Sequence, residues 1–440
     1  MSRAWIALLL GWGLLSCVAP APRPTPAEPP PPAPAAEPET WLLVRGGRVM
    51  TAAGPTLERA DVLVRGERIE AVGTDLEGPA GARVIEAEGR WVTPGLIDPH
   101  SHIGVYPQPN LRANADGNES SDPFTPEVRA EDAFWPQDPA IERALAGGVT
   151  TILVLPGSAN LVGGQGVALR LVPALSAAGM RVDGAPTSLK MACGENPKRV
   201  HGERSRPKTR MGSLAMLREE LADAQGYTPP KDAPPDPARA ALAAALRGEF
   251  LIQHHCYRAD EMLGRIALFE QFDARPRAFH HAVEAYKIAP QLAAAGVAAV
   301  VWADWRGVKL ELEDAVPAGA ALLHVQGVRV ALHSDSPEDI QRMNQQAARA
   351  LAAGLRAGLE LDADDAIRWI TANPAWVLGV ESRLGTLEPG KDADLTIWSG
   401  DPFSVYTRAE RVFIRGTEVY ARSAEPEPPR SDFELGRELF

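Results

Sequence analysis

Two histidines, His100 and His102, end an apolar stretch that begins at Val92. Side chains alternate across a β-strand, so residues two positions apart point the same way. Two neutral imidazoles on one face are a common ligand pair for a divalent metal ion. The pattern therefore predicts a strand that carries a metal-binding pair at its carboxyl end.

The middle of the chain alternates short apolar runs with long Ala- and Leu-rich helical runs. The apolar runs are residues 148–155, 249–255, 297–301 and 328–332. Such alternation is typical of βαβ units and a parallel sheet. Strand-like segments occur at both ends of the chain, so we predict an α/β fold: a (β/α)₈ barrel with a small β-sandwich formed by the N- and C-terminal segments. Active sites in such barrels lie at the carboxyl ends of the strands.

The expected domain organisation follows these composition changes. The run Gly163-Gly164-Gln165-Gly166 is interpreted as a tight loop of the barrel. The predicted segments are a signal peptide with a lipobox (1–17), a Pro-rich linker (18–40), the N-terminal half of the β-sandwich (41–90), the barrel with its metal-binding residues (91–380), the C-terminal half of the β-sandwich (381–422) and a tail (423–440).

The N-terminus has the order of a targeting signal. Arg3 precedes an apolar stretch from Ala4 to Leu15, which is too short to span a membrane as a mature helix. It ends in Leu14-Leu15-Ser16-Cys17 and resembles a bacterial lipoprotein signal. That resemblance implies cleavage before Cys17 and a lipid anchor on it, facing the periplasm. The competing interpretation is a plain secretory signal with an incidental cysteine.

Charge and cysteine content restrict the partners and the covalent framework. The formal net charge of −12 argues against nucleic acid as a partner, because phosphate binding needs a basic surface. Three cysteines make no disulfide framework. We expect Cys193 and Cys256 to be small buried apolar residues.

Further segments extend the pattern around the histidine pair. Residues 92–102 read VTPGLIDPHSH, residues 148–151 GVTT and residues 385–395 GTLEPGKDADL. Together they resemble the amidohydrolase superfamily over almost all of residues 41–422. Within it, residues 189–197, 258–261 and 281–286 resemble the imidazolonepropionase-like group, which includes Xaa-Pro dipeptidase-like enzymes.

The resemblance implies a set of metal ligands around one or two divalent ions. One ligand is His254 or His255 and another is His280 or His281, and the motif match favours His255 and His281. Each unused neighbour would then pack or hydrogen-bond outside the barrel. Imidazole and carboxylate suit Zn²⁺ and also admit iron, manganese or cobalt. The implied ligands are His100, His102, Lys190, His255, His281 and Asp335.

Lys190 decides between two kinds of metal centre. If carboxylated by CO₂, it would bridge two ions, as a lysine does in many relatives. If it instead pairs with a carboxylate such as Glu195, the centre is mononuclear. Asp335 is expected to be both a metal ligand and the general base.

Substrate contacts are expected around the metal. Tyr257 and Arg258 follow the metal-binding histidine and are candidates to polarise a carbonyl or hold a carboxylate. His333 shares strand parity with Asp335, so it either lines the pocket or packs behind it. Trp302, Asp304, Trp305 and Lys309 follow another candidate strand and either contact substrate or simply pack there.

The function predicted is metal-dependent hydrolysis of a C–N bond in a small amide, dipeptide or cyclic amide. A metal-activated hydroxide would attack the carbonyl, with Asp335 as base. A deaminase is the nearest competing function. Deaminases of this superfamily resemble one another in having Glu three residues after the metal-binding histidine, and Arg258 occupies that position here. Three further hypotheses are ester or phosphoester hydrolysis, an inactive lipid-anchored binding protein and a structural envelope protein.

Overall fold

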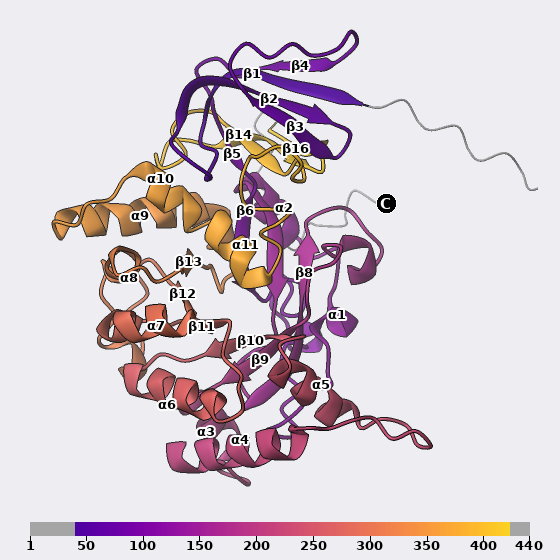
Figure 1. Ribbon diagram of the computed structural model, residues 1–440, viewed down its shortest axis with the longest axis vertical. Coiled ribbons are helices and arrows are strands. Elements are labelled where there is room, and N and C mark those ends of the chain that lie inside the picture. The colour runs from indigo at the N-terminus through magenta and orange to yellow at the C-terminus, as the bar shows by residue number, and fades with distance from the viewer. Residues whose placement is uncertain (1–39, 423–440) are drawn as a thin grey trace, which may run out of the picture. The chain divides into compact units, whose positions relative to one another are not determined.

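Eight short strands form one curved sheet that is nearly closed into a barrel (Figure 1). Each strand pairs with the next along the chain. The strands are β6 (Leu96–Ser101), β7 (Val149–Val154), β8 (Val162–Arg170), β9 (Ser188–Ala192), β10 (Leu251–His255), β11 (Ala278–His280), β12 (Ala298–Val301) and β13 (Val330–Leu332). The computed structural model describes residues 40–422, so the predicted signal and tail lie outside it, as does nearly all of the linker. The predicted barrel is confirmed.

The two ends of this sheet meet through side-chain and backbone hydrogen bonds. Ser334 follows β13, and its Oγ donates to Asp98 Oδ2 on β6 at 2.5 Å. The backbone N–H of Asp335 donates to the carbonyl of His100 at 3.2 Å. Burial raises the pKa of Asp98 to about 7, although the hydrogen bonds from Ser334 and His100 act to lower it. The closure of the barrel therefore lies directly beside the first histidine.

Helices pack on the outer side of the barrel, and α6 to α9 follow β10 to β13 in chain order (Figure 1). Local signals fix several ends: Asp236 caps α5 by accepting from Ala238, and α7 ends at Gly296, whose φ is +63°. The α-helices are α1 (Ala130–Ala133), α2 (Ala140–Ala146), α3 (Glu195–His201), α4 (Arg210–Ala224), α5 (Pro237–Leu246), α6 (Ala259–Glu270), α7 (Ala289–Ala295), α8 (Gly319–Val325), α9 (Met343–Arg356), α10 (Ala363–Arg368) and α11 (Ala372–Leu378).

One barrel strand, β8, runs antiparallel to both of its neighbours. The sequence predicts a parallel sheet, and for this strand the prediction is wrong. The chain returns from β7 to β8 through residues 155–161, which is too short for the crossover that parallel strands need. The glycine run lies within β8 and is not a loop. A Cβ on Gly164, whose φ is +120°, would lie 2.6 Å from Val128.

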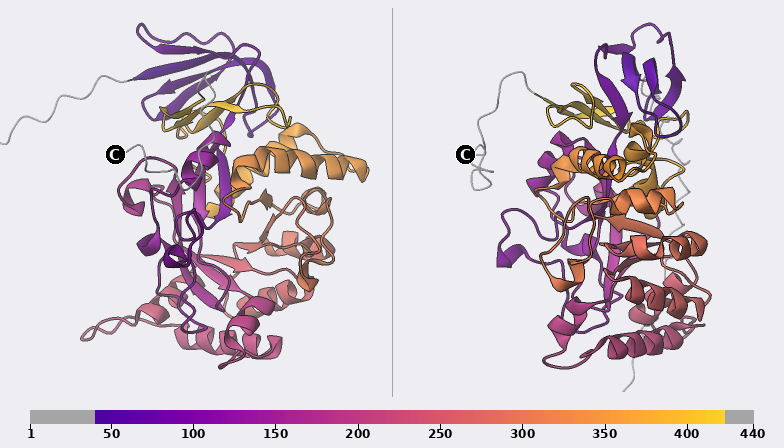
Figure 2. Two further views of the ribbon diagram at one scale, coloured as in Figure 1. Left: turned by 180° about the vertical axis from the view of Figure 1, so that it is seen from behind. Right: turned by 90° about the vertical axis from the view of Figure 1, so that its left-hand side faces the viewer.

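A second sheet combines both ends of the described chain (Figure 2). Its order is β16-β15-β14-β5-β1-β2-β3, with β4 beside β1. The antiparallel pair β5–β14 joins the N-terminal strands to the C-terminal ones. The strands are β1 (Trp41–Val49), β2 (Leu57–Arg65), β3 (Arg68–Gly73), β4 (Arg83–Glu86), β5 (Trp91–Pro94), β14 (Leu395–Trp398), β15 (Ala409–Ile414) and β16 (Thr417–Ala421). The predicted β-rich module from both termini is confirmed, although β5 lies within the segment predicted as barrel.

A buried ion-pair network links the small sheet to the barrel. Arg170 on β8 pairs with Asp392 and lies 3.5 Å from Asp394. Arg68 and Arg383 also reach Asp392, at 2.9 and 2.8 Å. The side chain of Asp392 is 1% exposed, so its charge depends on these three guanidinium groups.

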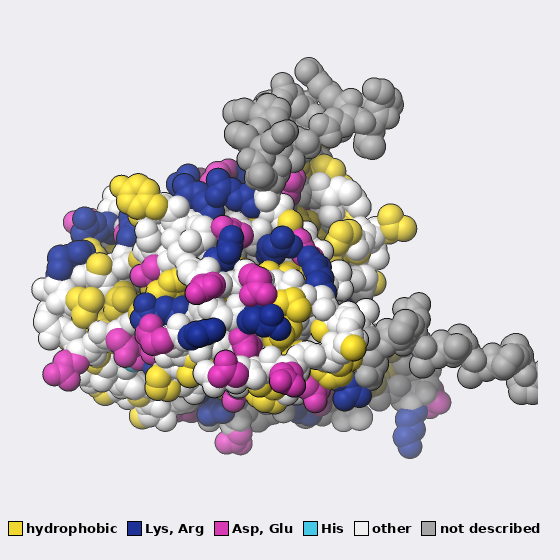
Figure 3. All heavy atoms as spheres, turned by 90° about the horizontal axis from the view of Figure 1, so that it is seen from above, with side chains coloured by type: hydrophobic (Ala, Val, Ile, Leu, Met, Phe, Trp, Pro, Cys, Tyr) yellow, Lys and Arg dark blue, Asp and Glu magenta, His cyan; other side chains and the backbone are white. Residues whose placement is uncertain are grey.

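The outer surface near the small sheet is covered by charges of both signs. Figure 3 shows basic and acidic side chains side by side on this face. Exposed pairs such as Arg45–Glu86, at 3.3 Å, contribute to the pattern. Within residues 40–422, no helix combines the length and apolarity needed to cross a bilayer.

Candidate metal centre

Side chains from five barrel strands or the residues just after them converge at one end of the barrel. Potential ligand atoms form two overlapping groups in which all atoms lie within 4.8 Å of one another. One group is His100, His281 and His333, and the other is His100, His102 and Asp335. His100 belongs to both groups, so it lies at the middle of the arrangement.

Hydrogen bonds set the tautomer of His100 through a relay of buried side chains. The Gln253 amide donates to the carbonyl of Val377 at 3.0 Å, which turns its Oε1 toward His280 Nε2 at 2.8 Å. An amide oxygen only accepts, so His280 Nε2 holds the hydrogen and its Nδ1 is free to accept. His100 Nδ1, 2.9 Å away, is then the donor. The lone pair of His100 is left on Nε2, which faces the cluster.

His102 is oriented in the same way. Its Nδ1 lies 2.8 Å from the carbonyl oxygen of Leu155 and must donate to it. In a neutral His102, Nε2 then carries a lone pair at 3.2 Å from Asp335 Oδ1. A lone pair facing a carboxylate is unfavourable unless a cation lies between them. This geometry fits a bound metal ion, with the other ring nitrogen held by an outer partner.

The Asp335 carboxylate is the acidic group of the cluster. It lies 3.7 Å from His100 Nε2 and 3.8 Å from His281 Nδ1. Burial raises its pKa, but the electrostatic effect of the nearby His102, His333 and Lys190 outweighs burial, so the pKa of Asp335 is lowered. Asp335 is therefore ionised at neutral pH, as a metal ligand must be.

Lys190 on β9 reaches the same cluster. Its Nζ donates to the carbonyl of Pro156 at 2.8 Å and lies 3.5 Å from His100 Nε2. Glu195, the carboxylate considered as a partner for Lys190, pairs instead with Lys309 at 3.2 Å. Burial lowers the pKa of Lys190 to about 7. A neutral amine, the form that reacts with CO₂, is therefore accessible near neutral pH.

On β10 the two adjacent histidines take opposite sides, as strand alternation requires. The ring of His255 lies 4.7 Å from that of His281, between centroids, and its Nδ1 has no hydrogen-bond partner. His254 packs in the outer core against Phe269 and Phe279, with its ring centroid 6.3 and 5.7 Å from theirs. The structure therefore brings His255, and not His254, to the cluster.

At β11 alternation breaks down. His281 has a φ of +58°, outside the extended region, so it faces the cluster although the adjacent His280 also points inward. The expectation that the unused neighbour lies outside the barrel is therefore wrong for His280. His280 lies inside and orients His100. Sequence reasoning missed it because a backbone kink at one non-glycine residue leaves no sequence signal.

His333 is buried in the cluster with both ring nitrogens unpartnered. Its ring lies 4.7 Å from His281 and 5.3 Å from His100, between centroids. Burial is the main reason that its pKa is lowered to about 4. Buried polar atoms normally have partners. The free nitrogens of His255, His281 and His333 around one region therefore fit a divalent cation.

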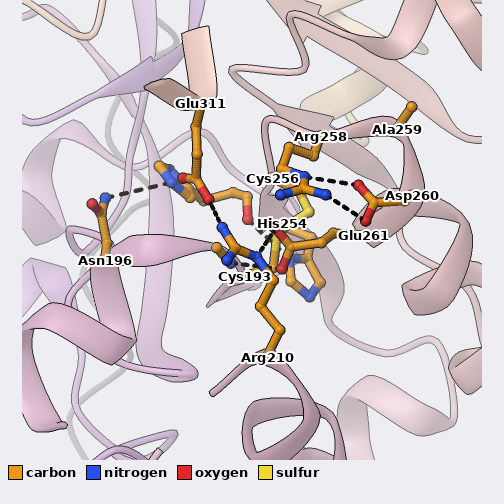
Figure 4. The surroundings of a disulfide bond; sticks show 12 residues. Cys193, Asn196, Arg210, His254, Cys256, Arg258, Ala259, Asp260, Glu261 and Glu311 are labelled. Atoms are coloured by element: carbon orange, nitrogen blue, oxygen red, sulfur yellow. Dashed lines mark hydrogen bonds and ion pairs between the residues drawn. A yellow bond between two sulfur atoms is a disulfide. The ribbon is translucent and has the colours of Figure 1, made fainter. Parts of the chain in front are cut away.

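The two other predicted substrate contacts have different positions. Tyr257 lies over the cluster, with its ring 4.6 Å from His255 and 5.8 Å from His281. Arg258 forms two 2.9 Å hydrogen bonds to Asp260, and its side chain is 41% exposed (Figure 4). The structure therefore brings Tyr257, and not Arg258, to the histidines.

Cys193 and Cys256 form a disulfide bond (Figure 4). Both are buried as expected, but the prediction that they are separate apolar residues is wrong. They are 63 residues apart in sequence, and their Cα atoms lie 5.2 Å apart because each follows one of the paired strands β9 and β10. Only the strand pairing brings them together.

Comparison with known proteins adds the family. The profile of the Amidohydrolase family matches residues 91–422. The chain belongs to this family. The match covers all barrel strands and the C-terminal strands of the small sheet, so the (β/α)₈ architecture and the resemblance read from the motifs are confirmed.

Individual amidohydrolase relatives extend this match. Amidohydrolase tasK of Hapsidospora irregularis is 36% identical over 395 residues, which are 82% of this chain and 40% of that protein. The chain thus spans well under half of tasK. An imidazolonepropionase of Caulobacter vibrioides is 26% identical over 363 residues, 78% of this chain and 88% of the relative. A crystal structure of an amidohydrolase from Thermotoga maritima MSB8 has a TM-score of 0.80 and 39% identity, and covers 87% of this chain and 100% of the other.

Family and geometry together give the class of activity. The protein is a metal-dependent hydrolase of the amidohydrolase superfamily. Its histidine cluster suits a divalent ion such as zinc.

Proposed function

We propose that the protein hydrolyses the amide bond of a small substrate, such as a dipeptide or a cyclic amide, with Asp335 as general base. The observation that carries this proposal is the pair of overlapping ligand groups that share His100 and include an ionised Asp335. Zinc is the ion that this set of imidazoles and carboxylate suits best.

The side chains divide the chemistry among them. A divalent ion held by His100, His102, His281 and Asp335 would supply an activated water and polarise the carbonyl. Asp335 accepts the proton of the water on a carboxylate oxygen and returns it to the departing nitrogen. His102 and His100 would offer their Nε2 lone pairs to such an ion, because Leu155 and His280 hold their other nitrogens. Lys190, once carboxylated, would hold a second ion beside the first, together with His255, whose Nδ1 has no other partner.

Metal content and hydrolysis test this proposal together. Residues 18–440 are purified, metals per chain are determined, and hydrolysis of matched amide and ester libraries is measured. We expect about two ions per chain and a preference for amides. Lys190→Ala should lose about one ion, because no bridging ligand remains, whereas Lys309→Ala should keep both.

The results separate the competing hypotheses. About one ion in both the wild type and Lys190→Ala would remove Lys190 from the ligands and leave a mononuclear centre. Cleavage of esters alone would replace the amide assignment. No bound metal after supplementation with zinc, manganese or iron would contradict the metal centre itself.

Three aromatic side chains beside the cluster, Tyr257, Trp302 and Trp305, suggest a substrate preference, and we call them the aromatic wall. Trp302 stacks on His281 at 4.4 Å between ring centroids, and Trp305 stacks on Trp302 at 4.9 Å. Trp305 is 40% exposed, so its outer face is open to a ligand. We propose that a planar or aromatic group of the substrate stacks there.

Substitution of Trp305 tests this preference. Trp305→Ala should lower kcat/KM about tenfold for an amide with an aromatic group, since the stacking contact is lost. Trp305→Phe should retain most of it. The same amide with a methyl group in place of the ring should change little in either variant. Equal losses for both amides would show that Trp305 only packs.

We also propose that the protein is exported and lipid-anchored at Cys17, a residue outside the described region of the chain. The Cys193–Cys256 disulfide supports export, because disulfides persist mainly in oxidising compartments. Cys17→Ser should move the protein from the membrane fraction to a soluble or secreted fraction of the producing cells. If wild type and Cys17→Ser fractionate alike, the anchor assignment fails.

A further inference from the structure

The disulfide lies in the same layer of the barrel as the metal cluster. Cys193 comes three residues after Lys190, and Cys256 directly follows His255. The backbone N–H of Cys193 donates to the carbonyl of His255 at 2.9 Å, and that of Cys256 donates to His280 at 3.0 Å. The bond therefore ties together the carboxyl ends of β9 and β10, at the points where these strands present their cluster residues.

Charged side chains hold the segment that follows Cys193 (Figure 4). The backbone N–H of Gly194 donates to Glu261 at 3.1 Å, and that of Glu195 donates to Glu311 at 3.2 Å. Arg210 pairs with both glutamates, at 2.8 Å from Glu261. The segment turns at Gly194, whose φ is +80°, where a Cβ would lie 2.9 Å from the Glu311 carboxylate. The segment that follows Cys193 is thus held by the disulfide at its start and by Glu261 and Glu311 after it.

His255 differs from His100 and His102 in how it is oriented. His100 and His102 each have a ring nitrogen held by a hydrogen bond of 2.9 Å or less. His255 has only a 3.5 Å contact from Asn196 Nδ2 to its Nε2, and its Nδ1 has no partner. Metal-binding histidines are normally oriented by a hydrogen bond to the second nitrogen. The position of His255 therefore depends on its backbone, which the disulfide constrains.

We propose that Cys193 and Cys256 are positioning residues of the metal centre. Their disulfide holds His255 and Lys190 at the spacing that the metal requires, so its loss weakens metal binding. This inference rests on the proposed metal centre. It also makes full metal affinity a property of the oxidised chain, which is reached in a compartment that permits disulfides.

The test compares zinc affinity, measured by competition with a chelator, in wild type and in Cys193→Ala/Cys256→Ala. Alanine is used because both sites are buried and apolar. We expect zinc binding to weaken about 10- to 100-fold, the usual cost of losing a group that orients a ligand. The visible absorption of the cobalt-loaded protein should also change, since the ligand geometry changes. The zinc affinity and the cobalt spectrum are both measured under conditions in which the metal-free proteins are fully folded.

Ile252→Val provides a matched control on the same strand. Ile252 lies on β10, is 2% exposed and faces the outer core with Leu217 and Leu268. This variant should unfold more easily while its zinc affinity and cobalt spectrum stay at wild-type values. If the disulfide had only a structural role, the double variant would behave in the same way.

A second measurement uses the unmodified sequence in two oxidation states. Protein purified with free thiols is oxidised with glutathione disulfide: the two cysteines lose two protons and two electrons, and one glutathione disulfide becomes two glutathione thiols. Zinc affinity should rise to the wild-type oxidised value. Equal affinity before and after oxidation, or in wild type and the double variant, overturns the inference and leaves the metal centre intact. If oxidised wild type binds no metal at all, the metal centre fails as well.

Discussion

Replacement of Asp335 by asparagine is expected to lower kcat by about 10²- to 10⁴-fold, the range usual for loss of a general base. Asparagine has the same shape and keeps one oxygen toward the cluster, but it cannot accept a proton. Its missing charge should also weaken metal binding, because the carboxylate lies 3.2 Å from His102 Nε2 and 3.7 Å from His100 Nε2. Kinetics are therefore measured with saturating zinc, and bound metal is determined in the same samples.

Asp339→Asn is the control for this substitution. Asp339 lies four positions further along the chain and belongs to neither ligand group. Its replacement should leave kcat and metal content unchanged. A fully loaded Asp335→Asn enzyme with wild-type kcat would show that another group moves the proton.

The metal-free protein is expected to lose stability steeply as the pH falls below about 6.5. Burial lowers the pKa of six fully buried histidines below their ordinary value. These are His100, His254, His255, His280, His281 and His333. In this pH range the unfolded chain binds protons that the folded chain does not, so acid favours unfolding. Each such proton changes the free energy of unfolding by about 1.4 kcal/mol per pH unit.

Two other buried groups modify this pH dependence. The pKa of Asp98 is raised to about 7, so between its unfolded value of 3.8 and pH 7 the folded chain binds one extra proton, which opposes the histidines. The pKa of Lys190 is lowered from 10.5 to about 7, so the stability of the folded chain rises further as the pH increases between these two values. Urea unfolding of the metal-free protein from pH 5 to pH 8 measures the summed contribution of the histidines, Asp98 and Lys190 to the free energy of unfolding.

His254→Leu tests the origin of the acid sensitivity without touching the cluster. His254 packs against Phe269 and Phe279, and its Nε2 has no partner. In the variant, the number of protons taken up on unfolding should be smaller by about one, because leucine does not titrate. A free energy of unfolding that stays constant between pH 7.5 and pH 5.5 in wild type would contradict the assignment of these histidines as buried and neutral.

The barrel could be predicted because hydrophobic periodicity reports which segments are strands and which are helices. The direction of β8 could not be predicted in this way, since a buried strand has the same composition in either direction. What decides it is the short connection after Val154, and the glycines beside it suggest a loop equally well.

The candidate site shows the same limit at the level of single residues. Strand alternation places His100 and His102 on one face, and the structure brings both to Asp335. Alternation fails at His281, whose backbone leaves the extended region. The orientation of Arg258 toward Asp260 and the pairing of Cys193 with Cys256 depend on contacts between neighbouring elements. Local sequence patterns carry no record of such contacts.

The pairing of β5 with β14 has a consequence for the order of folding. Trp91 pairs with Trp398 and Pro94 with Leu395, so the whole barrel is made between the two partners. During synthesis β5 has no partner strand from the C-terminal side until the ribosome has completed the barrel and passed residue 398. A nascent chain therefore carries one unpaired strand edge through most of its elongation, and such edges promote aggregation. If the protein is threaded through a membrane before it folds, β5 and β14 become available to each other at almost the same moment.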